Sequence, residues 1–391
     1  MKKLGILLVF ILLPWQGAQA ASLEVAGWIP WWQDTMGVES AEDNIRKLDI
    51  IYPFAFEVQP DGTLKDRADL DEKKWRDLFK QADKRRVDVL PTVMWFDGDQ
   101  IHAVLSDKKK RQAHIEEIVD MVEEGDFDGV NIDYEGKLSD TIDYFSDFLE
   151  ELEDELGRKD LSCTIEARTP PGMIYKEGEI PNPIRYANDY KAMNKYCDWV
   201  EIMAYDQQRA ILTLNKNRQG EPYNPVADTE WVEEVIKLAL EDIDEDKIML
   251  GVPTYGRQWD LVVAPEWYKS YTRVSALNMP DAEELADDYD KEPGRNAAGE
   301  LSYTYFHKDT IWGILDKYID TPKGTRQGFE AAAKALLFAN ASGMEIPVRL
   351  VWYSDAGAIE EKVELAEKYD LKGIAIFKID GEEDPDIWDL F

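Results

Sequence analysis

The residues best suited to chemistry lie in one short run, where Asn131, Asp133 and Glu135 alternate with apolar or aromatic residues. If this run is a β-strand, the three polar side chains share one face, because successive side chains of a strand point to opposite faces. Burying unpaired charge is costly, so such a face indicates either a solvated edge strand or an active site. We favour the active site, because a carboxylate at Asp133 raises the proton affinity of Glu135 and suits it to donate a proton from the strand tip.

The rest of the chain alternates short apolar runs with longer amphipathic ones, which indicates strands separated by helices. The predicted strands cover residues 23–29, 49–57, 87–95, 129–134, 161–167, 199–205, 247–254 and 373–377, and the predicted helices include 73–85, 112–124, 142–156, 231–240 and 359–369. Strands separated by helices need crossover connections, which predicts a parallel sheet. Eight such units predict an α/β fold of the closed (β/α)8 TIM-barrel type, with the active site at the carboxyl ends of the strands. An open doubly wound sheet is the alternative, but no Gly-rich phosphate turn follows the first predicted strand.

One connection is too long for an unstructured loop. About a hundred residues separate Tyr255 from the helix that begins near residue 358. They include an expected hairpin at 296–305, a helix at 326–342 and a strand at 348–353. We therefore predict a small α+β subdomain at 258–353, inserted between strand seven and helix seven. The barrel is then formed by residues 21–257 and 354–391.

Residues 1–20 have the layout of a secretory signal peptide. They combine a basic start, an apolar run over residues 4–15 and the small-x-small sequence Ala18-Gln19-Ala20. This pattern predicts export to the cell envelope or the extracellular space, with no membrane span after cleavage. An uncleaved amino-terminal anchor is the alternative.

Acidic residues outnumber basic ones by 80 to 45, and the formal net charge is −35. A negative field repels nucleic acid and anionic lipid, so neither is expected as a partner, and solubility accounts for the charge.

Cys163 and Cys197 could pair in an exported protein but form no metal-binding spacing. The three histidines, His102, His114 and His307, are scattered, so we expect no metal site and no cofactor. The sequence makes no prediction of the oligomeric state.

Several separate motifs resemble glycoside hydrolase family 18, the chitinases and related N-acetylglucosaminidases. Residues 128–135 read Asp-Gly-Val-Asn-Ile-Asp-Tyr-Glu, which is similar to the family signature Asp-Gly-x-Asp-x-Asp-x-Glu on strand four. Met203-Ala204-Tyr205-Asp206 resembles the strand-six motif Met-x-Tyr-Asp, and Tyr255-Gly256-Arg257 resembles the strand-seven motif Tyr-Gly-Arg. Residues 351–375 also resemble the approach to strand eight, so the resemblance spans nearly the whole mature chain.

Two positions depart from the family pattern. Asn131 stands where the family more often has an acid, and asparagine here is common in the branch that contains bacterial cell-wall and spore-cortex N-acetylglucosaminidases. Phe377 stands where strand eight usually ends in a tryptophan below the sugar site. A phenylalanine still offers an apolar face for stacking.

The resemblance implies a retaining glycosidase that acts on β-1,4-linked N-acetylglucosamine, in chitin and chitooligosaccharides or in peptidoglycan strands. Glu135 then protonates the leaving oxygen while the substrate's own N-acetyl oxygen attacks. Asp133 orients the acetamido nitrogen, and Tyr205 donates a hydrogen bond to the attacking oxygen. Asp206 supports the ring hydroxyls or the tyrosine. Asn131 is expected to donate a hydrogen bond that favours ionised Asp133.

Further residues are candidates for substrate binding. A pyranose presents an apolar face that a flat ring can cover, and Trp95 and Trp32 lie near predicted strand ends. Met203, Arg257 and Phe377 are assigned to the sugar site through the family motifs. For Arg257, a surface ion pair is the alternative.

Two other functions fit parts of the pattern. One is a sugar-binding protein that kept the fold and lost catalysis, although the proton donor that such proteins usually lack is present here as Glu135. The other is a barrel enzyme that uses Glu135 and Asp133 as metal ligands, which the scattered histidines do not support.

Overall fold

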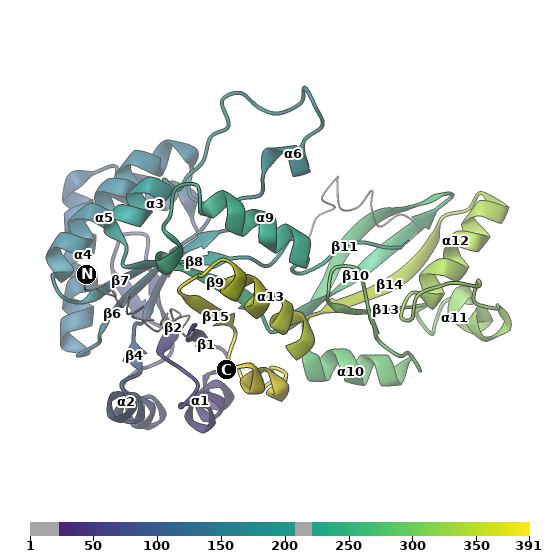
Figure 1. Ribbon diagram of the computed structural model, residues 1–391, viewed down its shortest axis with the longest axis horizontal. Coiled ribbons are helices and arrows are strands. Elements are labelled where there is room, and N and C mark those ends of the chain that lie inside the picture. The colour runs from purple at the N-terminus through teal and green to yellow at the C-terminus, as the bar shows by residue number, and fades with distance from the viewer. Residues whose placement is uncertain (1–22, 208–220) are drawn as a thin grey trace, which may run out of the picture.

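The computed structural model describes residues 23–207 and 221–391. The predicted signal peptide lies outside the described residues. Figure 1 shows a barrel surrounded by helices, with a second sheet extending to one side of it. No helix within the described ranges is both long enough and apolar enough to span a membrane.

Eight parallel strands close into a barrel, which confirms the predicted fold. Around the barrel, neighbouring strands follow the order β1-β2-β5-β6-β7-β8-β9-β15, and β15 pairs with β1. The strands are β1 (Glu24–Pro30), β2 (Ile50–Val58), β5 (Thr92–Trp95), β6 (Gly129–Tyr134), β7 (Asp160–Glu166), β8 (Trp199–Met203), β9 (Ile248–Pro253) and β15 (Gly373–Phe377). A short strand, β3 (Leu64–Asp66), pairs antiparallel with β2.

The third predicted strand is interrupted. Residues 87–95 were expected to be continuous, but β4 (Asp88–Val89) is separated from β5 by Leu90 and Pro91. Pro91 has no N–H to donate to a neighbouring strand, so it breaks the ladder at this point.

Helices cover the outside of the barrel (Figure 1). They are α1 (Asp34–Asp43), α2 (Lys73–Arg85), α3 (Gly98–Leu105), α4 (Lys108–Glu124), α5 (Ile142–Leu156), α7 (Tyr190–Tyr196), α9 (Thr229–Ala239) and α13 (Ala356–Lys368). The short helix α6 (Pro171–Ile174) lies instead on the loop after β7, which projects away from the barrel in Figure 1. Aspartates start several of them: Asp97, Asp107 and Asp355 accept backbone N–H groups of the first turn. Such caps satisfy donors that the helix itself leaves unpaired.

The barrel strands have two buried faces, which carry different clusters. Trp28 and Tyr52 belong to a cluster inside the barrel, whereas their neighbours Ile29 and Ile51 pack in the layer between strands and helices. This alternation follows from the period of two along a strand. An interior side chain near a strand's carboxyl end can therefore reach a site at that end of the barrel.

A second, antiparallel sheet is formed by the residues between β9 and α13 (Figure 1). Its order is β11-β10-β14-β13-β12. The strands are β10 (Tyr255–Ala264), β11 (Trp267–Asn278), β12 (Gly294–Arg295), β13 (Leu301–Tyr305) and β14 (Ile346–Tyr353), with helices α10 (Met279–Asp288), α11 (Ile311–Leu315) and α12 (Glu330–Ser342). Helix α12 begins later than the predicted residue 326, since Gly328 has a φ of +89°, which a right-handed helix cannot contain.

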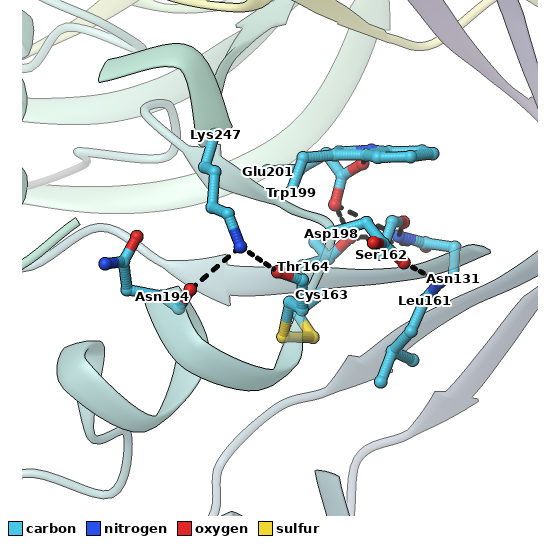
Figure 2. The surroundings of a disulfide bond; sticks show 11 residues. Asn131, Leu161, Ser162, Cys163, Thr164, Asn194, Asp198, Trp199, Glu201 and Lys247 are labelled. Carbon is cyan, nitrogen blue, oxygen red and sulfur yellow. Dashed lines mark hydrogen bonds between the residues drawn. A yellow bond between two sulfur atoms is a disulfide. The ribbon is translucent and has the colours of Figure 1, made fainter. Parts of the chain in front are cut away.

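A disulfide joins Cys163 in β7 to Cys197 at the end of α7, with Cα atoms 6.2 Å apart. Figure 2 shows Lys247 beside it, whose Nζ donates to the carbonyl oxygens of Asn194 and Cys197 at 2.9 Å. The bridge and the lysine together tie the α7–β8 connection to the strands next to it.

Candidate active site

Strand β6 delivers the central carboxylates to the carboxyl end of the barrel. Its register with β5 pairs Asn131 with Thr92 and Asp133 with Met94, and Met94 belongs to the interior cluster. Asp133 is only 3% exposed. Glu135 follows the strand, is half-buried, and its backbone N–H donates to the carbonyl oxygen of Trp95 at 2.8 Å. The predicted face of β6 therefore points into the barrel.

A cavity of about 580 Å³ opens at this end of the barrel. The residues that line it come from the ends of β1, β2, β6, β7, β8 and β15 and from the loops that follow: they include Trp28, Phe54, Asp133, Glu135, Glu166, Arg168, Arg185, Tyr186, Met203, Tyr205, Asp206 and Phe377. A second hollow of about 290 Å³ shares Phe54, Glu135 and Phe377 with it and also contains Trp32. The two hollows form one extended depression around Glu135.

Glu135 is set up to hold a proton near neutral pH. Burial, and then the negative charge of Glu166, raise its pKa to about 7. The sequence attributed this shift to Asp133, whose own pKa is raised by the charge of Glu135, so the two carboxyl groups oppose each other's ionisation. Glu166, at the tip of the neighbouring strand, and Asp206 add to the shift of Glu135. Near neutrality Glu135 can then deliver its proton to a leaving group and later take one back.

Asp133 is a buried carboxyl group with an open hydrogen-bonding position. Burial, and then the charge of Glu135, raise the pKa of Asp133 well above its ordinary value. Its Oδ1 has no hydrogen-bond partner within the described part of the chain. Buried polar atoms are nearly always paired, so an unpaired carboxyl oxygen that lines a cavity fits a donor supplied by a ligand.

Asn131 does not make the predicted hydrogen bond to Asp133. Its Nδ2 donates to Ser162 Oγ at 2.6 Å, Thr164 Oγ1 at 2.9 Å and Glu201 Oε2 at 3.2 Å (Figure 2). The register of β6 with β7 places Asn131 opposite Ser162, so the amide reaches across to the next strands instead of along its own. Asn131 therefore belongs to a polar network below the cavity.

The centre of that network is Glu201, which the sequence analysis missed. It lies on β8, is fully buried, and accepts hydrogen bonds from Tyr52 and from Trp199 Nε1, the latter at 2.6 Å. Burial raises the pKa of Glu201 to about 7, although these hydrogen bonds oppose the shift. Its strand position, two residues before Met203 on the same face, was the available sequence signal.

Tyr205 and Asp206 lie just past the end of β8. The ring of Tyr205 stacks on Phe377 with centroids 5.5 Å apart, and burial raises the pKa of Tyr205, so its hydroxyl keeps its proton. Asp206 accepts two hydrogen bonds from Arg257, at 2.9 and 3.0 Å. Arg257 is not among the residues that line the cavity, so it holds Asp206 through an ion pair, which was the alternative for this residue.

The prediction that Trp95 lines the groove is wrong. Trp95 is 2% exposed and packs against Tyr134 and His114 between the strands and the helices. It pairs with Tyr134 in the register of β5 with β6, so it faces away from the barrel interior. Trp32 does line the smaller hollow, and Trp28, which the sequence did not single out as a groove residue, lines the cavity itself.

Two further charged groups surround the carboxyl pair. Glu166 accepts from the Gly136 N–H at 2.9 Å and from Asn188 Nδ2 at 3.1 Å. The Lys137 Nζ lies 4.0 Å from it, with the lysine side chain fully buried. Although burial opposes the change, Lys137 and these hydrogen bonds hold the pKa of Glu166 below its usual value. Glu166 closes a predicted strand, so its position at a strand tip was a signal that the sequence analysis did not use.

The described residues contain no group of three or more His, Cys, Asp or Glu side chains placed to hold a metal ion. The site offers a proton donor, a carboxyl oxygen open to a ligand, a tyrosine hydroxyl and an aromatic floor formed by Trp28 and Phe377.

Comparisons with known proteins agree with this arrangement. The sequence is 23% identical over 340 residues to a cortical fragment-lytic enzyme of Bacillus anthracis, covering 86% of this chain and 66% of that protein. The spore cortex-lytic enzyme SleL of Bacillus cereus superposes with a TM-score of 0.67 at 21% identity, over 94% of this chain and 73% of the other. A chitinase of Chromobacterium violaceum gives 0.66 at 18% identity, over 94% and 98%.

The chain spans 64–66% of the length of three curated relatives, so each of these relatives has a part that the chain does not match. The solved structures share the fold. The model of the family described as glycosyl hydrolases family 18 matches residues 31–382. This match covers most of the chain, so the chain belongs to glycosyl hydrolases family 18.

Proposed function

We propose that this protein is a retaining glycosidase that cleaves β-1,4 linkages of N-acetylglucosamine-containing glycans and uses the substrate's N-acetyl group as the nucleophile. The observation that carries the proposal is the pair formed by Glu135, whose pKa is raised to about 7, and Asp133, whose buried Oδ1 is unpaired within the described residues. One group holds a proton for the leaving oxygen, and the other offers an acceptor for the acetamido N–H.

The proposed reaction has two steps. In the first, Glu135 gives its proton to the glycosidic oxygen, the N-acetyl carbonyl oxygen bonds to the anomeric carbon, and the glycosidic bond breaks. The positive oxazolinium ion that forms is stabilised by Asp133, which holds its N–H. In the second step Glu135 removes a proton from water, the water oxygen bonds to the anomeric carbon, and the ring opens to regenerate the N-acetyl group. Two inversions give net retention.

The remaining residues hold the sugar. The Tyr205 hydroxyl lies on the cavity wall and stays protonated, which suits it to donate a hydrogen bond to the carbonyl oxygen that attacks. Phe377 and Trp28 line the same cavity and can cover the apolar face of the ring. Asp206, held by Arg257, offers acceptors for sugar hydroxyls.

A protein nucleophile is the competing mechanism, and Glu166 is the carboxylate that could serve. Its two oxygens already accept from Gly136 and Asn188, and Lys137 balances its charge. These partners favour Glu166 as a fixed charge that raises the pKa of Glu135. A thiazoline analogue of the oxazolinium ion should therefore inhibit competitively, whereas labelling of Glu166 by a 2-fluoro glycoside would contradict substrate assistance.

Two polymers are candidate substrates, chitin and the glycan strands of peptidoglycan. The matched relatives include proteins named for each, a chitinase and spore cortex-lytic enzymes. Both polymers lie outside the cell, and the composition of residues 1–20 supports an exported protein.

Product analysis by mass spectrometry tests the proposal. The mature protein and its Glu135→Gln variant are incubated with chitooligosaccharides and, separately, with purified peptidoglycan. We expect fragments ending in N-acetylglucosamine from the wild type alone. Retention on a polymer without cleavage by the wild type would identify a sugar-binding protein instead.

A further inference from the structure

Most of the charged groups that line the cavity have a partner of opposite charge. Asp206 is paired with Arg257 at 2.9 Å, Glu166 lies 4.0 Å from Lys137, and Arg185 is paired with Asp140 at 3.0 Å. The catalytic pair carries less negative charge near neutrality than its two carboxyl groups suggest, because the pKa values of both are raised.

Arg168 is different. It lines the cavity from the loop after β7, and within residues 23–207 and 221–391 no carboxylate oxygen lies within 4 Å of its guanidinium. Residues 1–22 and 208–220 contain no Asp or Glu that could pair with it. Among the charged groups of the described residues that line the cavity, Arg168 therefore lacks the carboxylate partner that Arg185 has in Asp140.

The guanidinium of Arg168 is also held in place. It lies 3.7 Å from the ring centroid of Tyr186 and 3.9 Å from that of Tyr190, and its Nη2 donates to the Asn188 carbonyl oxygen at 2.8 Å. An arginine fixed in this way loses little conformational freedom when it binds an anion. Its remaining N–H groups suit the planar, two-oxygen geometry of a carboxylate.

The two candidate polymers differ in the group that such an arginine recognises. Chitin carries no acid. Peptidoglycan strands carry carboxylates, either on the lactyl ether of every second sugar or on the peptide stem attached to it. A fixed cation that lines the same cavity as the catalytic acid can therefore distinguish the two polymers by their charge.

We propose that Arg168 is a specificity-determining residue that binds a carboxylate carried by the glycan, so that this site prefers acidic N-acetylglucosamine-containing strands over neutral chitin. This inference rests on the proposed function and names the substrate class of the same site. The structural alternative is that Arg168 only clamps the loop that carries Tyr186. A clamp would affect both kinds of substrate equally, whereas an anion-binding residue affects only the acidic one.

The test compares kcat/KM of the wild type and of Arg168→Gln on soluble chitooligosaccharides, on acidic glycan strands, and on the same strands after their carboxylates have been amidated. We expect the preference for acidic over neutral strands to fall about 10- to 100-fold, the range for a hydrogen bond to a charged group. Arg168→Lys keeps the charge and should retain part of the preference. An equal loss on all three substrates, or an unchanged preference, overturns the proposal.

Two control variants test whether the effect is specific to Arg168, and strands with and without peptide stems identify the carboxylate that it binds. Arg76→Gln removes an exposed arginine of α2 that lines none of the cavities described above and should change nothing. Arg185→Gln removes a charge that Asp140 already balances, so it should lower the preference less than Arg168→Gln. Stem-bearing and stem-free strands are assayed separately to assign the bound carboxylate, because an attached stem converts the lactyl carboxylate to an amide. A preference shown only for stem-free strands belongs to the lactyl group, and one shown only for stem-bearing strands belongs to the stem.

A binding measurement separates this inference from the proposed function. Calorimetry with the Glu135→Gln protein measures the affinity for acidic and amidated strands at low and high salt. Stronger, salt-sensitive binding of the acidic strands that depends on Arg168 supports the anion site even if the wild type cleaves nothing. Equal affinity for both kinds of strand overturns it even if cleavage is observed.

Discussion

The two ends of the barrel both carry carboxylates, but the groups are used in opposite ways. At the amino ends of the strands, Asp49, Asp128 and Asp198 are exposed, and each accepts a backbone N–H of a neighbouring strand at 2.8–2.9 Å. At the carboxyl ends, Asp133 is buried and one of its oxygens has no partner in the described residues.

This difference teaches how to distinguish a structural carboxylate from a functional one. An exposed carboxylate that accepts a backbone N–H stabilises strand pairing at little desolvation cost. A buried carboxyl group without a full set of partners destabilises the fold and persists where a ligand completes it. The number of acidic residues near a strand end does not show which of them are functional, whereas the hydrogen-bond partners of each one do.

The largest expected effect is on the proton donor. Glu135→Gln keeps the shape of the side chain but removes the proton that the leaving oxygen needs. We expect kcat to fall by about 10²- to 10⁴-fold, the usual contribution of a general acid. Steady-state kinetics on a soluble oligosaccharide measures the loss, and a melting temperature no lower than that of the wild type serves as the control for folding. A variant with wild-type kcat would contradict the assignment of Glu135.

Asp133→Asn should separate activity from stability. We expect kcat to fall by about 10²- to 10³-fold, because the oxazolinium ion loses the carboxyl group that accepts its N–H. The melting temperature should rise, since the substitution removes a buried ionisable group whose pKa is strongly raised. Calorimetry and kinetics on the same preparation read both quantities. A fall in both would show that Asp133 has structural partners after all.

The pH profile tests the charge that acts on Glu135. The acid works only while protonated, so kcat/KM of the wild type should decline as the pH rises through about 7. Glu166→Gln removes the negative charge that favours the protonated form, which lowers the pKa of Glu135. The alkaline limb of the profile should therefore move to lower pH. A limb that stays in place would show that the charge of Glu166 does not contribute to the raised pKa of Glu135.

The smallest effect is expected at the amino end of the barrel. Asp198→Ala leaves the Leu161 N–H without its acceptor and should lower the free energy of unfolding by about 0.5–1.5 kcal/mol. The catalytic groups are at the other end of the strands, so kcat should not change. Chemical denaturation measures the stability, and a large loss of activity at unchanged stability would break the contrast between the two ends.

Much of the fold was predictable because it follows from local patterns. The eight strands were placed by their apolar runs, and helices α2 and α5 have the predicted bounds. The direction of Trp95 was not predictable in the same way. Alternation defines two faces of a strand, but the register of β5 with β6 decides which face points inward.

By itself the sequence determined that Asn131, Asp133 and Glu135 lie in one line, because side chains two residues apart on a strand must share a face. Only the tertiary structure decided what each of them meets. Asn131 donates a hydrogen bond to Glu201 on β8, and the charge of Glu166 on β7 raises the pKa of Glu135. Hydrogen bonds and pKa values depend on distances between strands that are far apart in the chain, and these distances are defined only once the barrel closes.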